Sequence, residues 1–240
     1  AVNWFALSSP FSKMCLAELA VEFRSCTACS SWSDNSLTWF RCSCFGHPGL
    51  LARAAQSHEI ASHARWHASF SVDDLATSRA ILRAASVQEV LGFRRPRLQY
   101  TEPTAIAAAG YAYDSSVNPI WLPGRYSNRS LPRIPYRVGG ILEVPISTTP
   151  GLRLPLFWLA WKNLPMPIVR DACERCLAAD GVLNLFWHPW EFIDLRGAGL
   201  PLHMRRIDGE RMCDRFAAFV DWLRSRGRFA TFTEWMGRGI

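Results

Sequence analysis

From about residue 48 onward, helical and strand-like patterns alternate along the chain, and this alternation constrains the fold more than any other feature. Apolar residues that recur every three to four positions predict helices, and short apolar runs between turn residues predict strands. Helices are expected over residues 48–56, 102–109 and 168–179, after Ser71, and along the apolar stripe from Met212 to Leu223. Strands are expected over residues 58–62, 111–114, 141–146, 182–187 and 229–232. This order is typical of an α/β fold with a largely parallel sheet.

The first 46 residues do not follow this alternation, which divides the chain into a divergent N-terminal part, residues 1–46, and a main domain, residues 47–240. The N-terminal part is rich in Ser, Cys and Trp and shows no clean period of two or of 3.6 residues. Its pairs Cys26 with Cys29 and Cys42 with Cys44 resemble zinc-ligand spacing, although one residue and not two separates the second pair. A divergent module and a truncated or frame-shifted stretch both stay open, and the abrupt start of the pattern favours the second.

The composition is that of a globular protein: 49% of the residues are apolar, 20% are charged, and the net charge is +7. The positive charge comes almost entirely from arginines spread along the chain, as a GC-rich bacterial genome would give, so no nucleic-acid partner is expected. No uncharged apolar run is long enough for a membrane span. The first residues lack a signal-peptide pattern, which favours a cytoplasmic over a secreted location.

Two histidines, His63 and His67, follow the strand expected over residues 58–62. A strand that ends near one histidine, with a second four residues later, can direct both imidazoles at one point. Imidazole is a good ligand for zinc and related divalent ions. The spacing is therefore compatible with a metal site, although structural histidines also occur at such spacings. His58, at the opposite end of the strand, is expected to be structural.

A third histidine, His188, follows the apolar strand expected over residues 182–187 and begins the run His-Pro-Trp-Glu-Phe. In barrels of alternating strands and helices, the active site lies at the carboxyl ends of the strands. A histidine there can protonate a leaving group, or can simply be a hydrogen-bonded residue at a strand end. Glu191 is placed to orient it, and Trp190 offers either a sugar-stacking face or a core position.

Two further segments carry candidate residues. Within Gly-Phe-Arg-Arg-Pro-Arg, Arg94 can hold a carboxylate by a bidentate contact, and Pro96 restrains the backbone. Such a segment is more often a loop with surface arginines. Within Tyr-Asp-Ser-Ser, Asp114 stands at a strand end, where a turn-capping role is favoured over a catalytic one.

Taken in order, these segments resemble the polysaccharide deacetylase family, also called the NodB-homology or carbohydrate esterase 4 group, over about residues 48–235. The runs Leu-Glu-Val-Pro from Leu142 and His-Pro-Trp-Glu-Phe from His188 resemble the branch found in bacterial exopolysaccharide clusters. The resemblance implies a distorted (β/α) barrel with fewer than eight strands, here with its first strand or strands degraded or absent. It also implies a divalent metal, usually zinc, and an N-acetylated carbohydrate substrate in a polysaccharide or its lipid-linked precursor.

The resemblance also implies roles for individual residues. His63 and His67 would bind the metal, His188 would protonate the departing amine, and Arg94 would orient the catalytic base. The residues expected at the substrate are Trp190, Pro96 and Asp114.

This chain departs from the family at two places. The family's first motif supplies an aspartate pair, whereas Asn3 stands in the closest match here. Position 97 is Arg where a small residue is usual, which puts the substrate fit in doubt. We therefore expect weak or no hydrolysis. The alternatives are a catalytically inactive carbohydrate-binding or assembly module on the same fold, and a basic zinc-ribbon binder of nucleic acid built on the N-terminal cysteines.

Overall fold

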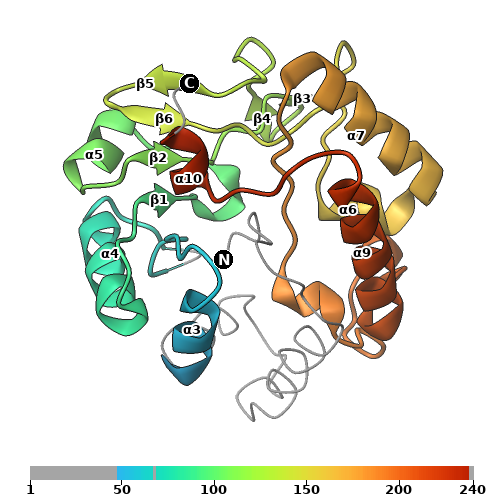
Figure 1. Ribbon diagram of the computed structural model, residues 1–240, viewed down its shortest axis with the longest axis horizontal. Helices are drawn as coiled ribbons and strands as arrows, with labels where there is room; N and C mark the ends of the chain where they lie inside the picture. Colours follow the sequence, from blue (N-terminus) through green and yellow to red (C-terminus); the bar gives the residue numbers. More distant parts are fainter. Residues whose placement is uncertain (1–47, 67–68, 238–240) are drawn as a thin grey trace.

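The structure is a computed structural model that describes residues 48–66 and 69–237 (Figure 1). The N-terminal part, including the cysteine pairs and Asn3, lies outside the described residues, and so does His67. The division of the chain at residue 46 therefore stays a prediction.

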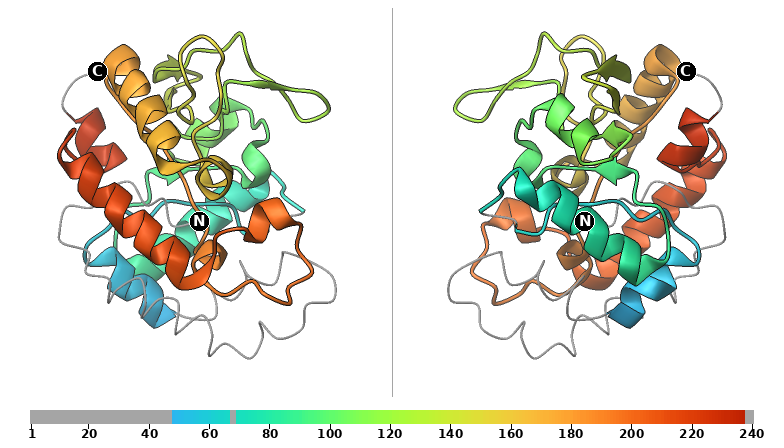
Figure 2. Two further views of the ribbon diagram at one scale, coloured as in Figure 1. Left: turned by 90° about the vertical axis from the view of Figure 1, so that its right-hand side faces the viewer. Right: turned by 90° about the vertical axis from the view of Figure 1, so that its left-hand side faces the viewer.

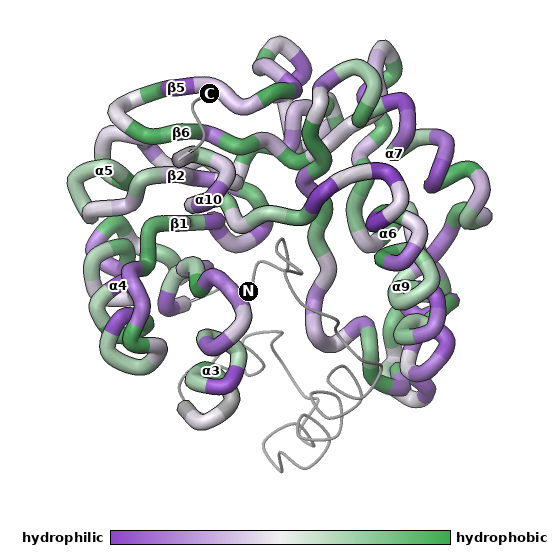
Figure 3. Tube along the Cα trace, in the orientation of Figure 1, coloured by the Kyte–Doolittle hydropathy of each residue, from purple (hydrophilic) through white to green (hydrophobic). Residues whose placement is uncertain are grey.

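A four-stranded sheet forms the first half of the described chain. Its strands are β1 (Gly92–Phe93), β2 (Tyr113–Asp114), β6 (Ile141–Glu143) and β5 (Tyr136–Val138), in that spatial order. The first three run parallel, and β5 pairs antiparallel with β6 at the edge. Ser62 adds a parallel bridge to Phe93 on the other side of β1. The carboxyl ends of four parallel segments therefore lie next to one another. In Figure 3, the chain at β1 and β6 is coloured mostly as hydrophobic.

Helices α4 (Asp73–Ser86) and α5 (Pro103–Ala108) pack on one face of this sheet, with α3 (Pro48–Ala55) beside α4. Their apolar stripes bury a cluster with the strands that includes Leu75, Leu82, Phe93, Ile106 and Ile141. The helix expected after Ser71 is α4; its N-cap is Val72, without a side-chain cap, and the Asp74 carboxylate accepts a hydrogen bond from the Ser71 amide at 3.0 Å.

The opposite face of the sheet packs against α10 (Phe232–Met236), where the Tyr113 and Phe232 rings lie 4.9 Å apart. Gly92 is required on this face, because a β-carbon there would lie 2.0 Å from Cζ of Tyr113. The Tyr113 hydroxyl donates to Glu59 Oε1 at 2.8 Å, which joins the segment before Ser62 to this face.

The second half of the chain packs three helices, α6 (Trp158–Asn163), α7 (Met166–Asp180) and α9 (Gly209–Arg224), around a separate core (Figures 1 and 2). Trp161 and Phe219 are fully buried at its centre with their rings 3.8 Å apart. The sharing of one apolar stripe by Met212, Phe216 and Phe219 confirms the helix expected there.

Residues 182–188, between α7 and the short helix that begins at Pro189, form an extended segment. The strand expected over residues 182–187 forms no ladder within the described residues. Single backbone contacts hold it: Ser147 N–H donates to Asn184 O at 2.9 Å, and Trp158 N–H donates to Phe186 O at 3.1 Å. The α/β class with a parallel sheet is confirmed. The described residues form an open sheet, so the closed, distorted barrel stays a prediction.

The strand expected over residues 229–232 is wrong, because α10 begins at Phe232. Thr231 and Glu234 form a capping box, in which each side chain accepts a hydrogen bond from the other residue's backbone amide. This exchange satisfies two amides at a helix start, so the local capping signal prevails over the short apolar run. The structure also contains a hairpin that the sequence pattern does not predict, formed by β3 (Trp121–Leu122) and β4 (Tyr126–Ser127).

Among the described helices, none combines the length and the apolar character that crossing a bilayer requires.

We expect Phe219→Ala to lower the free energy of unfolding by about 3–5 kcal/mol, because it leaves a cavity beside the buried Trp161 ring. Denaturant unfolding monitored by circular dichroism measures the change. Leu202→Ala, at a side chain that is 66% exposed, is the matched control and should shift stability by no more than about 0.5 kcal/mol. Equal losses in both variants would contradict this description of the core.

Candidate functional site

His63 lies at the carboxyl end of the Ser62 bridge and is buried. Its Nδ1 lies 2.7 Å from the carbonyl oxygen of Arg94, the residue after β1. A carbonyl oxygen only accepts, so Nδ1 must donate, which places the ring lone pair on Nε2. Metal-bound histidines adopt this arrangement, in which one ring nitrogen donates to a backbone carbonyl and the other ligates. His63 is therefore held in a form suited to metal binding.

The Arg94 side chain is buried beside the ends of the same strands. Its Nε donates to Ser115 O at 2.8 Å, and its Nη2 donates to Ser115 Oγ at 2.7 Å and to Asn184 Oδ1 at 3.2 Å. The guanidinium also lies over the Phe186 ring, 5.2 Å from its centroid. Burial lowers the pKa of Arg94 to about 10, although Tyr113, Asp114 and Glu143 nearby act in the opposite direction. At neutral pH the group is still charged.

The expected bidentate contact between Arg94 and a carboxylate does not occur within the described residues, where Arg94 forms no ion pair. Its partners there are neutral oxygens. A role in orienting a catalytic base stays a prediction.

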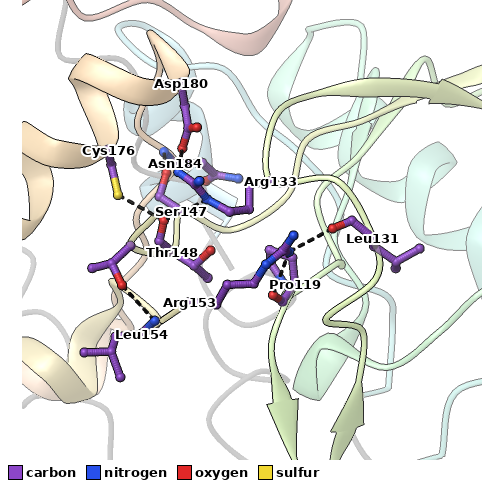
Figure 4. Close-up of polar contacts among 11 residues, drawn as sticks. Pro119, Leu131, Arg133, Ser147, Thr148, Arg153, Leu154, Cys176, Asp180 and Asn184 are labelled. Atoms are coloured by element: carbon purple, nitrogen blue, oxygen red, sulfur yellow. Dashed lines mark hydrogen bonds and ion pairs between the residues drawn. The ribbon is translucent and has the colours of Figure 1, made fainter. Parts of the chain in front are cut away.

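Asn184 is a site residue that the sequence reasoning misses. Its amide nitrogen donates to Ser115 Oγ at 2.8 Å, to Val144 O at 2.9 Å and to Pro145 O at 3.0 Å. Its backbone amide donates to Ser147 Oγ at 2.8 Å, and Figure 4 shows these two residues side by side. Asn184 thus fastens the extended segment to the ends of β2 and β6. The available signal is a single amide side chain inside the apolar run Val-Leu-Asn-Leu-Phe-Trp.

His188 follows this segment, and Glu191 holds it in place. Glu191 Oε1 accepts two hydrogen bonds, from His188 Nδ1 at 2.8 Å and from the His188 backbone amide at 2.8 Å. Glu191 lies in the short helix η3 (Pro189–Phe192) and is fully buried. Burial raises the pKa of the Glu191 carboxyl, whereas His188 and Lys162 oppose the shift. With Nδ1 donating to Glu191, proton exchange with a substrate would take place at Nε2.

Aromatic side chains surround the His188 ring. Trp190 stacks on it at 5.3 Å with an interplanar angle of 19°, while Trp158 and Phe186 each meet it edge-on at 5.6 Å. Trp158 also packs edge-on against Trp190 at 5.3 Å. All four side chains are half-buried. Trp158 and Phe186 join the predicted Trp190 in this aromatic group, and the sequence reasoning assigned neither of them to the site.

Phe186 links the two parts of the site, because its ring contacts both the Arg94 guanidinium and the His188 ring. A continuous chain of contacts therefore runs from His63 through Arg94 and Phe186 to His188. This chain of contacts passes through both the backbone carbonyl and the guanidinium of Arg94, and it links three of the expected residues. Their chemical roles stay predictions.

Pro96 is buried at the start of the short helix η2 (Pro96–Leu98). The preceding residue is fixed by a hydrogen bond of 2.7 Å from the Arg95 amide to Ser116 Oγ. Pro96 therefore supports the turn after β1, and its role at the substrate stays a prediction.

Asp114 is buried in a carboxyl pair. It lies opposite Glu143 in the parallel register of β2 and β6, and Ser116 Oγ donates to Asp114 Oδ1 at 2.5 Å. The Val117 amide donates to Glu143 Oε1 at 3.0 Å. Burial raises the pKa of Asp114 to about 6, and burial together with the Asp114 charge raises that of Glu143 well above its usual value. The charge of Asp114 therefore disfavours ionisation of Glu143. These contacts agree with the structural role favoured for Asp114.

Cys173 and Cys176 are buried in the core around α7, and burial raises the pKa values of both thiols. Within residues 48–66 and 69–237, no three or more His, Cys, Asp or Glu side chains are grouped so that they could hold a metal ion. A complete ligand set would therefore need residues beyond those described, such as His67.

No protein-family model matches this chain, and no curated protein matches it. Among solved structures, it is similar to a protein from Mycobacterium smegmatis that is provisionally described as a polysaccharide deacetylase. The identity is 17% and the TM-score is 0.49, over 80% of this chain and 67% of that chain.

The carboxyl pair predicts that stability depends on pH. A carboxyl whose pKa is raised on folding binds more protons in the native than in the unfolded state, so stability falls as the pH rises above the unfolded value. Glu143→Gln keeps the shape, supplies an amide donor to Asp114 and removes one titrating group. We expect this variant to be more stable than the wild type at pH 8, by roughly 1–3 kcal/mol, and to lose less stability between pH 5 and pH 8.

Urea unfolding across this pH range measures the effect. Glu210→Gln, at an exposed glutamate, is the matched control and should keep the wild-type pH dependence. A Glu143→Gln variant with an unchanged pH slope would show that the pair does not cause the pH dependence of stability.

Proposed function

We propose that this protein is a hydrolase of carbon–nitrogen amide bonds that removes acetyl groups from N-acetylated sugars of a polysaccharide or its lipid-linked precursor. One observation carries the proposal: His188 is oriented by a buried carboxylate, lies among aromatic rings, and is joined through Phe186 and Arg94 to a second oriented histidine, His63. The order of the sequence motifs supports the same reaction class.

The proposed acid is His188. An amine leaves an amide carbon readily only if it is protonated as the bond breaks, so a proton donor is needed beside the nitrogen. Glu191 fixes Nδ1 as a donor to its carboxylate, which directs Nε2 to the substrate and stabilises the ring when it carries a positive charge. The second, backbone hydrogen bond to the same oxygen prevents Glu191 from turning away.

The proposed metal ligands are His63 and His67. His63 fits the role because its Nδ1 bond to Arg94 O sets the tautomer that ligates through Nε2. Zinc is the proposed ion, since it accepts imidazole ligands readily. When bound, it would polarise the acetyl carbonyl and activate a water molecule.

The proposed sugar contacts are aromatic. The C–H faces of a pyranose ring pack against flat aromatic rings, and Trp158 and Trp190 are half-buried beside His188. Pro96 and Asp114 remain proposed as neighbours of the substrate, and both are buried. Turnover is expected to be slow, because Arg94 holds no carboxylate within the described residues that could serve as the base.

The aromatic group also favours a second candidate, a carbohydrate-binding module without turnover. Trp158, Trp190 and Phe186 would retain a sugar in this case, while the histidines would be structural.

We expect the zinc-loaded chain to release acetate slowly from N-acetylated oligosaccharides. His188→Ala should lower that rate at least tenfold, because removing a general acid typically costs about 10²–10⁴ in rate. The control is His203→Ala, at an exposed histidine in α8 (Leu202–Arg205), and should keep the wild-type rate. Acetate release that His188→Ala leaves unchanged would refute the assignment. Oligosaccharide binding without acetate release, weakened by Trp158→Ala, would favour the binding module.

We expect His63→Ala to weaken zinc binding at least tenfold, because it removes a ligand whose tautomer is already set. Chelator competition at neutral pH measures the affinity, and His203→Ala is again the control. Equal zinc affinity in the wild type and both variants would remove the metal site from the proposal.

A further inference from the structure

The segment between residues 119 and 154 exposes an unusual amount of apolar surface. Half of the large apolar side chains that are exposed in the described part of the chain belong to it: Trp121 (62%), Leu122 (44%), Ile134 (50%), Val138 (36%), Leu152 (76%) and Leu154 (55%). Scattered apolar residues on a surface need no explanation, but a concentration of them marks an interaction site.

The same segment is strongly basic. It contains five arginines, Arg125, Arg129, Arg133, Arg137 and Arg153, and its single acidic residue is the buried Glu143. Within the described residues, Arg133 alone among the five forms an ion pair, with Asp180. Arg125, Arg129 and Arg137 are exposed, so the segment carries positive charge as well as exposed apolar side chains.

Hydrogen bonds join the loop around Arg153 to the β3–β4 hairpin. The Arg153 Nη1 donates to Pro119 O at 3.1 Å and to Leu131 O at 2.8 Å, so the loop with Leu152 and Leu154 is held against both ends of the β3–β4 hairpin (Figure 4). Arg133 Nε donates to Thr148 O at 3.3 Å, which fixes the chain just before that loop. Figure 2 shows a yellow-green part of the chain, within this segment, extending from the body of the molecule.

The backbone of Arg153 indicates that this arrangement is specified. Its φ of +56° is unfavourable for a residue with a β-carbon, and strain of this kind persists where surrounding contacts determine the conformation. The two carbonyl contacts of its guanidinium are such contacts. They hold Leu152 and Leu154 in exposed positions.

We propose that residues 119–154 form a docking surface for a membrane containing anionic phospholipid, which the protein binds from one side. Trp and Leu side chains enter the boundary between head groups and acyl chains, and arginines of the same segment attract acidic lipids. A soluble polyanion would use the arginines but would leave Trp121, Leu152 and Leu154 in water. The proposal does not depend on the proposed hydrolase activity.

The test is co-sedimentation of the full chain with vesicles of phosphatidylglycerol and phosphatidylcholine in equal amounts, and with vesicles of phosphatidylcholine alone. We expect binding to the anionic vesicles that weakens with added salt, because salt screens the arginines. The double variants Trp121→Ser/Leu152→Ser and Arg125→Glu/Arg129→Glu should each lower the affinity at least tenfold.

The matched control is Leu202→Ser/Arg206→Glu, which removes an exposed leucine and an exposed arginine elsewhere and should bind as the wild type does. Circular dichroism confirms that each variant folds, and the two surface variants test the proposal independently. Equal binding by the control and the surface variants would overturn it. So would binding that Trp121→Ser/Leu152→Ser leaves intact and that soluble polyphosphate abolishes, since that pattern belongs to a polyanion site.

Discussion

The buried guanidinium of Arg94 is the interaction on which the arrangement of the site depends. Removing a charge from water is costly unless its donors are satisfied, and Ser115 and Asn184 accept the hydrogen bonds of Arg94 at 2.7–3.2 Å. The Phe186 ring covers the group as well. Through its backbone carbonyl, the same residue orients His63. One residue, through its side chain and its backbone carbonyl, therefore joins the ends of β1 and β2, His63 and the extended segment of residues 182–188.

This arrangement explains how His188 reaches the site without a strand to carry it. An extended segment without a ladder has unpaired backbone groups that water or side chains must satisfy. Here the Asn184 side-chain amide donates hydrogen bonds to three oxygens at the ends of β2 and β6. The Ser147 amide donates to the Asn184 carbonyl oxygen, and Ser147 Oγ accepts from the Asn184 backbone amide. These contacts fix the path of the chain just before Phe186 and His188.

The sequence predicts what is periodic and local. The long helices follow from their apolar stripes, and the parallel arrangement follows from the alternation of elements. The error at residues 229–232 was avoidable, because Thr231 followed by Glu234 is a helix-start pattern that can be read from the sequence. The role of Asn184 was not predictable in the same way. An amide within an apolar run signals a buried hydrogen-bonding role, but its partners are 39–69 residues away in the sequence.

The parallel register of β2 and β6 places Asp114 opposite Glu143, a contact that composition alone does not predict. Successive side chains in a strand point to opposite faces, so Asp114 and Ser115 are directed away from each other. Ser115 faces Arg94, while Asp114 pairs with Glu143 and lies opposite Phe93, which packs with α4 and α5. Burial raises the pKa values of both carboxyls, and the charge of Asp114 raises that of Glu143 further, so this pair gives the stability of the fold a pH dependence of its own.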